Sequence, residues 1–305
     1  RNTTITTTLQ LYQCQKLYEI QAGMFDGVTF GSSADLDIYY NRGLRVLRAD
    51  AFAGLRLRNL DIRGFSSSSL FFQLIEVIEP FAFRDVIASR LLLTYTNVTN
   101  LQTDTFNGLS VFDTFDLEYH NYLSTLSPHP FRNLTMTTTS TTRKTFSIQY
   151  LPALTAIPAD VLSDLNESLG LYRMTIHDLD TLQYIAPKAF DGVFVSNSLD
   201  LYNFDTLEYI SPGAFDGLWV GNTMDIRNNP GLLEISAKTF TEDTHIGGTL
   251  DITTNEALST VREEAFLGLS VPTLNLRTLA SLSVIESGAF RNTTITTRLQ
   301  LYQCQ

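Results

Sequence analysis

The amino-acid sequence predicts an α/β solenoid, in which similar coils stack and each coil adds one short strand to a parallel β-sheet. Three observations predict this fold class. An apolar unit returns every 24 to 31 residues along the whole chain. Each unit opens on an L-x-L pair, whose period of two is that of a β-strand. The residues that follow are too few, and too often proline or glycine, for a long helix, so we expect a short helical, 3₁₀ or extended return.

Residues 199–218, LDLYNFDTLEYISPGAFDGL, show the unit most clearly. Leu199 and Leu201 form the strand pair, Leu207 and Ile210 belong to a following L-x-x-I, and Phe215 closes the unit. Side chains alternate between the two faces of a strand, so the L-x-L leucines share the buried face. We therefore expect each coil to run through a strand, a turn and a short return before the next strand begins.

Alignment of the copies gives twelve strand starts and eleven complete coils. The L-x-L pairs start at Leu9, Leu36, Leu60, Leu91, Phe115, Phe146, Met174, Leu199, Met224, Leu250, Leu274 and Leu299. The closing aromatic position holds Phe25, Phe52, Phe83, Phe106, Phe131, Phe190, Phe215, Phe240, Phe266 and Phe290, with Leu162 substituting once. A stack of such repeats is one quasi-linear body, which predicts a single solenoid over residues 1–305.

The unit resembles the leucine-rich repeat family. Residues 224–240, MDIRNNPGLLEISAKTF, are similar to repeats of glycoprotein-hormone-receptor ectodomains and of BspA-like surface proteins of microbes and protists. The resemblance implies a concave parallel β-sheet, short returns on the convex side and a spine of stacked Phe side chains. The family's ladder asparagine is matched by Asn41, Asn229 and Asn255, while other residues stand at this position elsewhere. The family's cysteine-rich caps are absent from the sequence, so the solenoid is expected to be uncapped.

A second repeat is longer than one coil. Residues 1–15, RNTTITTTLQLYQCQ, and residues 291–305, RNTTITTRLQLYQCQ, differ only at Thr8 and Arg298. The coils between them are far more diverged, so a common coil ancestor does not explain this match. The offset is 291 − 1 = 290 residues. We predict a super-repeat over residues 1–290, with residues 291–305 as the start of the next and the array continuing in both directions.

Charge and motifs exclude several classes of protein. The net charge of −11 argues against nucleic acid as a partner, because nucleic acids are bound through basic surfaces. The sequence has no apolar run of the roughly 18 residues that a membrane span needs. The four histidines show no H-x-x-x-H spacing, and there is no nucleophile elbow, phosphate loop or C-x-x-C motif. We therefore expect no enzyme activity, no cofactor and no catalytic metal.

The open face of the sheet carries the candidate binding residues. The position between the two strand leucines holds an aspartate in six coils: Asp37, Asp61, Asp116, Asp200, Asp225 and Asp251. Two positions further along, Tyr39, Tyr202 and Arg227 belong to a row of aromatic and cationic residues. The aspartates are interpreted as a solvated acidic strip, as a surface for a basic partner, or as a calcium site, although calcium prefers several oxygens around one point.

Five N-glycosylation sequons occur, at Asn2, Asn97, Asn133, Asn166 and Asn292. Such triplets arise by chance in a threonine-rich chain, so each is weak by itself. Asn2, Asn133 and Asn292 share a place two residues after the closing aromatic position, where the chain turns toward solvent. This shared placement favours attached glycans and a location outside the cell or on its surface.

Two functions remain from the sequence. The first is an extracellular structural or adhesive protein, a segment of a longer array that builds a fibre, hair or coat through solenoid stacking. Its partner would be protein, and in particular itself, by head-to-tail or lateral association. The alternative is a receptor-like ectodomain that binds a protein ligand on the concave face. The duplicated segments favour the first function, because a fibre needs recurring contacts.

Overall fold

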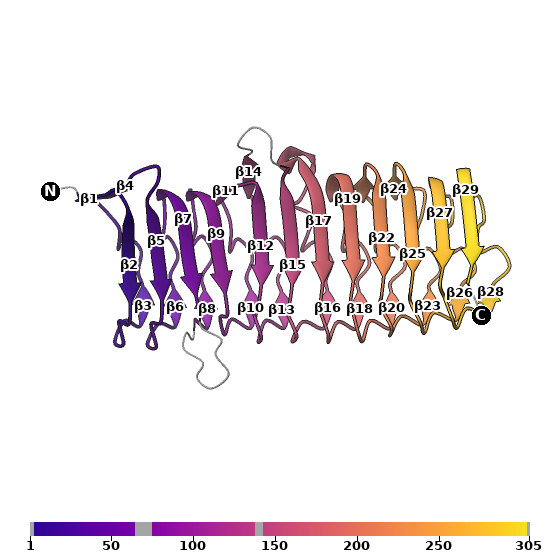
Figure 1. The fold of residues 1–305 in the computed structure, drawn as a ribbon, viewed down its shortest axis with the longest axis horizontal. Coiled ribbons are helices and arrows are strands. Elements are labelled where there is room, and N and C mark those ends of the chain that lie inside the picture. The colour runs from indigo at the N-terminus through magenta and orange to yellow at the C-terminus, as the bar shows by residue number, and fades with distance from the viewer. Residues whose placement is uncertain (1–2, 65–74, 138–142, 304–305) are drawn as a thin grey trace. The chain divides into compact units, whose positions relative to one another are not determined.

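The computed structural model describes residues 3–64, 75–137 and 143–303. Contacts group the chain into two units, residues 1–151 and 152–305, and each unit is described by itself. Within each unit, successive coils pair through parallel strands (Figure 1). Each unit is therefore a parallel β-solenoid.

In the first unit the long strands pair in chain order. They are β2 (Thr8–Tyr12), β5 (Asp35–Tyr39), β7 (Arg56–Arg63), β9 (Ile87–Thr94), β12 (Thr114–Glu118) and β15 (Thr145–Gln149). The returns form a second layer of short strands, β3 (Glu19–Ile20), β6 (Val46–Leu47) and β8 (Val77–Ile78), followed by β10 (Asn100–Leu101) and β13 (Thr125–Leu126). Additional short pairs join β1 (Thr3–Ile5) to β4 (Val28–Phe30), and β11 (Ser110–Phe112) to β9 and β14 (Thr135–Thr137).

The second unit repeats this plan. Its long strands are β17 (Leu171–His177), β19 (Phe194–Tyr202), β22 (Thr223–Arg227), β25 (Thr249–Thr253), β27 (Ser270–Arg277) and β29 (Thr294–Tyr302). Its return strands are β16 (Ala156–Ile157), β18 (Tyr184–Ile185), β20 (Tyr209–Ile210), β23 (Glu234–Ile235), β26 (Thr260–Val261) and β28 (Val284–Ile285). The short strand β21 (Trp219–Val220) pairs with β19 and with β24 (His245–Ile246).

The strand register follows the L-x-L alignment predicted from the sequence. In the first unit Leu9 pairs with Leu36, and Leu36 with Leu60. In the second unit Leu250 pairs with Leu274, and the pairing continues in the same frame. Along these strands buried and half-buried residues alternate, so one face packs into the core and the other stays open. The predicted parallel sheet is confirmed.

The predicted α/β class is wrong, and of the three forms expected for the returns, helical, 3₁₀ or extended, the extended form is found. Among the described residues there is no α-helix, and the one 3₁₀ helix is the three-residue η1 (Glu167–Leu169). Only residues 211–214 separate Ile210 from Phe215, too few to offset the cost of forming a first helical turn. Gly213 (φ 67°) and Gly217 (φ 77°) are also left-handed, a conformation that ends a right-handed helix. The returns are therefore short strands and turns.

A spine of phenylalanines fills each core. In the first unit the rings of Phe25, Phe52, Phe83, Phe106 and Phe131 stack with centroids 5.5–5.8 Å apart. In the second unit Phe190, Phe215, Phe240, Phe266 and Phe290 stack at 5.0–5.4 Å. Stacked rings on successive coils bury large apolar areas, so this spine holds neighbouring coils together.

The ladder asparagines satisfy backbone groups at the turn after the strand. Asn255 Oδ1 accepts a hydrogen bond from the backbone N–H of Asn229 at 2.9 Å, and its Nδ2 donates to the carbonyl of Ile226 at 3.1 Å. Asn41 accepts from the N–H of Cys14 in the same way, at 2.8 Å. These side chains are fully buried, and each joins two coils where the chain leaves the sheet.

At one position where asparagine is replaced, the previous coil supplies a partner. His120 stands at the ladder position, is buried, and its Nδ1 lies 2.7 Å from the Thr96 hydroxyl of the previous coil. Burial lowers the pKa of His120 to about 4, and the Leu93 carbonyl opposes this change only in part. The imidazole is therefore neutral at physiological pH and is a structural group.

Candidate interaction surface

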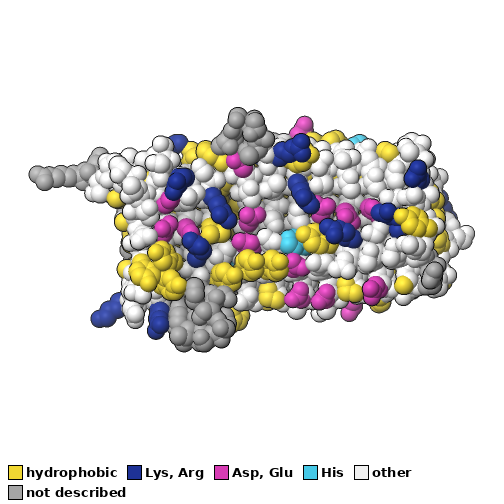
Figure 2. Space-filling model, viewed as in Figure 1, with side chains coloured by type: hydrophobic (Ala, Val, Ile, Leu, Met, Phe, Trp, Pro, Cys, Tyr) yellow, Lys and Arg dark blue, Asp and Glu magenta, His cyan; other side chains and the backbone are white. Residues whose placement is uncertain are grey.

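The open face of each unit carries two rows of side chains in register. We call the positions between the strand leucines the acid row, and those two residues further along the aromatic row. In the first unit Asp37 pairs in register with Asp61, and Tyr39 with Arg63. In the second unit the acid row passes from Asp200 through Asp225 and Asp251 to Asn275. Figure 2 shows acidic and basic side chains interspersed over the face formed by the long strands.

Each aspartate of the second unit's acid row has an arginine partner. The nitrogen–oxygen distances are 2.7 Å for Arg173 and Asp200, 2.7 Å for Arg227 and Asp225, and 2.5 Å for Arg277 and Asp251. Sequence reasoning identified Arg227 but missed Arg173, which precedes the strand pair by one residue. The acid row is thus a ladder of ion pairs, and its charge is largely compensated on the protein itself.

Asp225, at the centre of this ladder, is the most perturbed carboxyl. Burial raises the pKa of Asp225 to about 6, because Arg227 only partly offsets the desolvation and the neighbouring carboxylates of Asp251 and Asp200 add to it. One carboxyl oxygen of Asp225 and one of Asp251 are buried without a hydrogen-bond partner. Among the described residues no group of three or more His, Cys, Asp or Glu side chains is arranged to hold a metal ion.

The acid row of the first unit is more broken. Asp61 forms an ion pair with Arg63 of its own strand, and Asp37 accepts a hydrogen bond from the amide of Gln10 at 3.3 Å. Asp116 stands apart on β12, and burial raises its pKa although Arg90 acts in the opposite direction. The six aspartates therefore do not form one continuous acidic strip.

The aromatic row of the second unit holds Tyr202 between two neighbours. The ring of His177 stacks on it with centroids 4.6 Å apart and an interplanar angle of 4°. On its other side the guanidinium of Arg227 lies 4.4 Å from the ring centroid. Because both ring faces are covered, Tyr202 contributes a rigid edge to the surface.

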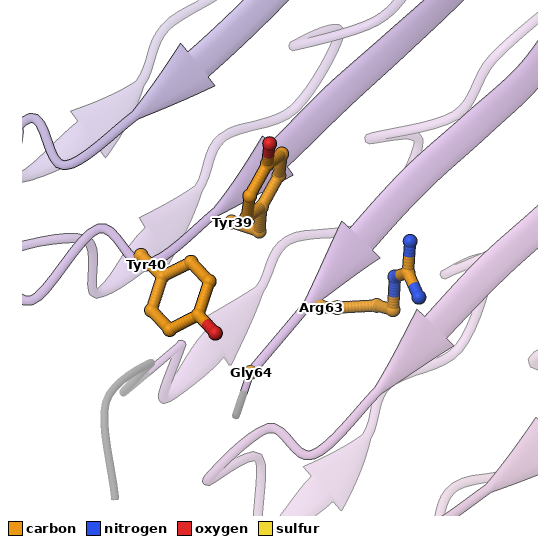
Figure 3. A pocket seen from close by; sticks show the side chains of 4 residues that line it. All are labelled: Tyr39, Tyr40, Arg63 and Gly64. Atoms are coloured by element: carbon orange, nitrogen blue, oxygen red, sulfur yellow. The ribbon is translucent and has the colours of Figure 1, made fainter. Parts of the chain in front are cut away.

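At the start of the first unit, three tyrosines pack around a small pocket. The ring centroids of Tyr12, Tyr39 and Tyr40 lie 4.9–5.5 Å apart and are tilted against one another. Beside them is a pocket of about 210 Å³ lined by Tyr39, Tyr40, Arg63 and Gly64 (Figure 3). The mutual contact of the rings leaves no space between them for a cation, which excludes an aromatic cage formed by the three.

A row of tyrosines that the sequence analysis missed follows the strands of the first unit. Tyr40, Tyr95, Tyr119 and Tyr150 each come directly after the last strand residue and have positive φ, between 53° and 59°. The ring centroids of Tyr95 and Tyr119 are 5.0 Å apart, and those of Tyr119 and Tyr150 are 4.7 Å apart. A bulky residue in the left-handed region is uncommon and costs conformational energy, which stacking offsets. Four strand motifs ending in Tyr, LDIYY, LLLTY, FDLEY and FSIQY, were the signal in the sequence.

In the second unit the same left-handed position is polar. Asn203 donates from Nδ2 to Asp178 Oδ1 at 2.7 Å, and Asn228 donates to Asn203 Oδ1 at 2.6 Å. Asparagine and aspartate tolerate this backbone conformation better than tyrosine does. The two units thus present different chemistry at equivalent corners, mostly aromatic in the first and polar in the second.

The sequons differ in accessibility. Asn166 is exposed and caps η1, and its Oδ1 accepts a hydrogen bond from the Ser168 hydroxyl at 2.6 Å. Asn292 is exposed, Asn97 is half-buried, and Asn133 is exposed but donates from its own amide to Asn107 at 3.0 Å. Asn2 lies outside the described residues. Attachment of glycans stays a prediction.

One part of the chain is similar to a known family of repeats. Residues 167–297 match the BspA type leucine rich repeat region, with six copies. The likeness covers less than half of the chain. These BspA-type repeats lie in the second unit and include its strands β17, β19, β22, β25 and β27, as the sequence pattern predicted.

Among solved structures, the crystal structure of the pneumococcal vaccine antigen PcpA is similar to this chain. The identity is 10%, the match covers 99% of this chain and 89% of that chain, and the TM-score is 0.25. No curated protein matches the sequence. In the described part of the chain, no helix has the length and apolar character to cross a membrane.

Proposed function

We propose that this chain is a segment of a longer array of super-repeats in a structural or adhesive protein of the cell surface, and that the array assembles into a fibre, hair or coat through solenoid stacking. One observation carries the proposal, the near identity of residues 1–15 and 291–305. The two segments occupy equivalent places, because Leu9 of β2 pairs with Leu36 and Leu299 of β29 pairs with Leu274 in the same frame. Both segments thus hold the same strand of the repeat.

This duplication suits a filament for a geometric reason. A contact between two different surfaces of identical subunits propagates in one direction unless its rotation closes a ring. When the same strand returns after 290 residues, each super-repeat offers the next the same contact. Eleven coils at about 4.8 Å per parallel strand give an axial repeat of about 53 Å.

A receptor-like role is the second candidate, and the open face of the first unit favours it. Tyr39 and Arg63 line a pocket there, and tyrosine and arginine are among the residues most enriched where proteins bind one another. In this role a protein ligand would lie across the acid and aromatic rows. This candidate would be favoured if the protein forms no filaments and binds a ligand in a fixed stoichiometry. The substitution Tyr39→Ala should then abolish that binding.

The experiment that tests the proposed function combines location with assembly. Antibodies against the folded chain are applied to intact and permeabilised source cells, and the purified protein is imaged by negative-stain electron microscopy across a concentration series. We expect labelling of intact cells and filaments with an axial repeat of about 53 Å. Labelling only after permeabilisation, or protein that stays monomeric at every concentration, would contradict it.

A further inference from the structure

Three tyrosines of the first unit form a continuous stack of rings. Tyr95, Tyr119 and Tyr150 directly follow β9, β12 and β15, and we call them the tyrosine stack. The ring centroids of Tyr95 and Tyr119 are 5.0 Å apart at an interplanar angle of 13°, and those of Tyr119 and Tyr150 are 4.7 Å apart at 4°. Neighbouring rings are thus nearly parallel and face one another, and each pair joins two successive coils.

The backbone holds these rings in place at a conformational cost. The values of φ are 55° for Tyr95, 59° for Tyr119 and 53° for Tyr150, in a region that bulky residues seldom adopt. The rings are not sealed inside the core, since Tyr95 and Tyr119 are half-buried and Tyr150 is 39% exposed. The stack is therefore fixed by the fold and open to small reagents in the solvent.

Two tyrosyl radicals couple most readily when their rings are stacked. A one-electron oxidant removes one electron and one proton from a phenol, which leaves unpaired spin on the ring carbons next to the C–O bond. This spin lies in a π orbital, so the new carbon–carbon bond forms across the ring faces. Each bonded carbon then passes its hydrogen to its own phenolic oxygen through water, and the product is dityrosine. Holding the reacting groups in this geometry removes much of the entropic barrier.

We propose that the tyrosine stack is a site of oxidative cross-linking, where a peroxide acting through a haem peroxidase joins Tyr119 to Tyr150 or to Tyr95. For each link the two phenols give up two electrons and two protons, and one molecule of hydrogen peroxide takes them up as two molecules of water. Tyr119 is needed for both links, because it lies between the other two rings. The link forms within one chain, so it does not require the assembly proposed above.

A link at this site would fasten coils that no disulfide can join. The sequence holds two cysteines, Cys14 and Cys304, and neither lies between residues 95 and 150. The links would close loops of 119 − 95 = 24 residues and 150 − 119 = 31 residues. A covalent link that closes a loop restricts the unfolded chain and so stabilises the folded one. Oxidation should therefore make the first unit harder to unfold.

Three other tyrosine contacts provide a comparison. Tyr12 meets Tyr40 edge to face at 87°, and it is tilted by 43° against Tyr39. In the second unit Tyr184 and Tyr209 are nearly parallel, but their centroids are 5.8 Å apart. Coupling across ring faces at short distance should favour the tyrosine stack over all three contacts.

Oxidation of the full chain in dilute solution tests this site. The protein is mixed with tris(bipyridine)ruthenium and persulfate and exposed to a short pulse of light, which produces tyrosyl radicals without an enzyme that must reach the rings. Monomer is isolated by size exclusion, so that links within one chain are measured. Digestion with trypsin and an aspartate-specific protease puts Tyr95, Tyr119 and Tyr150 on separate peptides. Mass spectrometry then identifies each linked pair by the loss of two hydrogens.

Phenylalanine variants identify the residues that react. Tyr119→Phe keeps a ring in the stack but lacks the phenol, so it should abolish both linked peptides. Tyr95→Phe should leave the link between Tyr119 and Tyr150. Tyr122→Phe is the matched control, because Tyr122 is 56% exposed and lies on the same peptide as Tyr119, and it should leave the yield unchanged. Far-ultraviolet circular dichroism establishes that each variant is folded.

The outcome depends on whether stacking or exposure directs the coupling. Links that involve mainly Tyr18 and Tyr122, the most exposed tyrosines among the described residues, would overturn the site. An equal yield of linked peptides from wild type and Tyr119→Phe would overturn it as well. Oxidation should raise the urea midpoint of the wild type and leave that of Tyr119→Phe unchanged. Equal changes in the two midpoints would overturn the stabilising role of the link.

Discussion

Replacing Asp225 by asparagine should stabilise the second unit at neutral pH. The pKa of this carboxyl is ordinarily 3.8 and rises to about 6 in the folded protein. This difference corresponds to about 3 kcal/mol of folding free energy between the protonated and the ionised form. The pKa of Asp225 is raised on folding. The stability that the protonated side chain contributes is therefore complete below pH 3.8 and is lost as the pH rises through 6. Its side chain is 21% exposed, so solvent screens little of this effect.

The assay uses the chain's single tryptophan. Trp219 lies in the second unit, stacked on Phe194 with centroids 4.2 Å apart, so its fluorescence reports unfolding of that unit. Urea unfolding is measured from about pH 4 to about pH 7 for the wild type and for Asp225→Asn. Between about pH 4 and about pH 7 the unfolding free energy of the variant, relative to that of the wild type, should increase by about 2.4 kcal/mol, because the full effect is reached only below pH 3.8. Asp180→Asn, at an exposed position of the same unit, is the control for the loss of one negative charge.

A flat difference for Asp225→Asn would refute the reasoning. It would mean that the ion pair with Arg227 compensates the burial of this carboxyl in full. A variant that is less stable at every pH would point to the same conclusion, because the asparagine amide cannot replace the charge that Arg227 needs.

Three further predictions concern the core, the ladder and the pocket. Phe240→Ala should destabilise the second unit by about 3–5 kcal/mol in urea, because the ring is fully buried between Phe215 and Phe266, while Phe240→Leu should lose less than half of that. Asn255→Ala should lower the unfolding free energy by about 2–4 kcal/mol, because two buried backbone groups lose their hydrogen-bond partner. Asn228→Ala, at the exposed corner, is the control, and an equally small loss of stability in Asn255→Ala would contradict this role. Gly64→Ala should destabilise the first unit in a thermal melt and distort the pocket, because a Cβ there would lie 1.9 Å from the Tyr95 carbonyl oxygen. Gly54→Ala is the control, because φ is +72° there and a Cβ would meet nothing within 4 Å, so it measures backbone strain without a clash. An equal loss of stability in the two variants would remove the steric argument.

The register of the strands and the two side-chain rows was predictable from the sequence. The L-x-L period fixes which residues face the core, and a slip of one residue would expose every leucine of a strand. The same period therefore places Asp200, Asp225 and Asp251 at equivalent positions of successive strands. The Phe spine followed from the family resemblance and from the recurring place of residues such as Phe215 at the close of each unit.

The partners of these rows were not predictable in the same way. Arg173 reaches Asp200 on the next coil, and the distance along the chain between such partners varies with the length of each return. His120 could be assigned to the ladder position, but its bond to Thr96 depends on two substitutions in adjacent coils. The pocket near Tyr40 arises because Gly64 lacks a side chain in the tyrosine row, a difference that appears only once the coils are aligned in space. The helical returns were overestimated because three or four residues cannot offset the cost of a helical turn.

The parallel ladders also determine how these solenoids respond to a pulling force. Hydrogen bonds between successive coils point along the direction in which the coils stack, so tension applied along that direction loads them one coil at a time. Strands loaded in this way open like a zip and require less force than strands sheared past one another. Each released coil of about 25 residues adds about 80–90 Å of extended chain. A surface protein built from such coils would lengthen stepwise under flow or traction and would shorten again, coil by coil, when the load is removed.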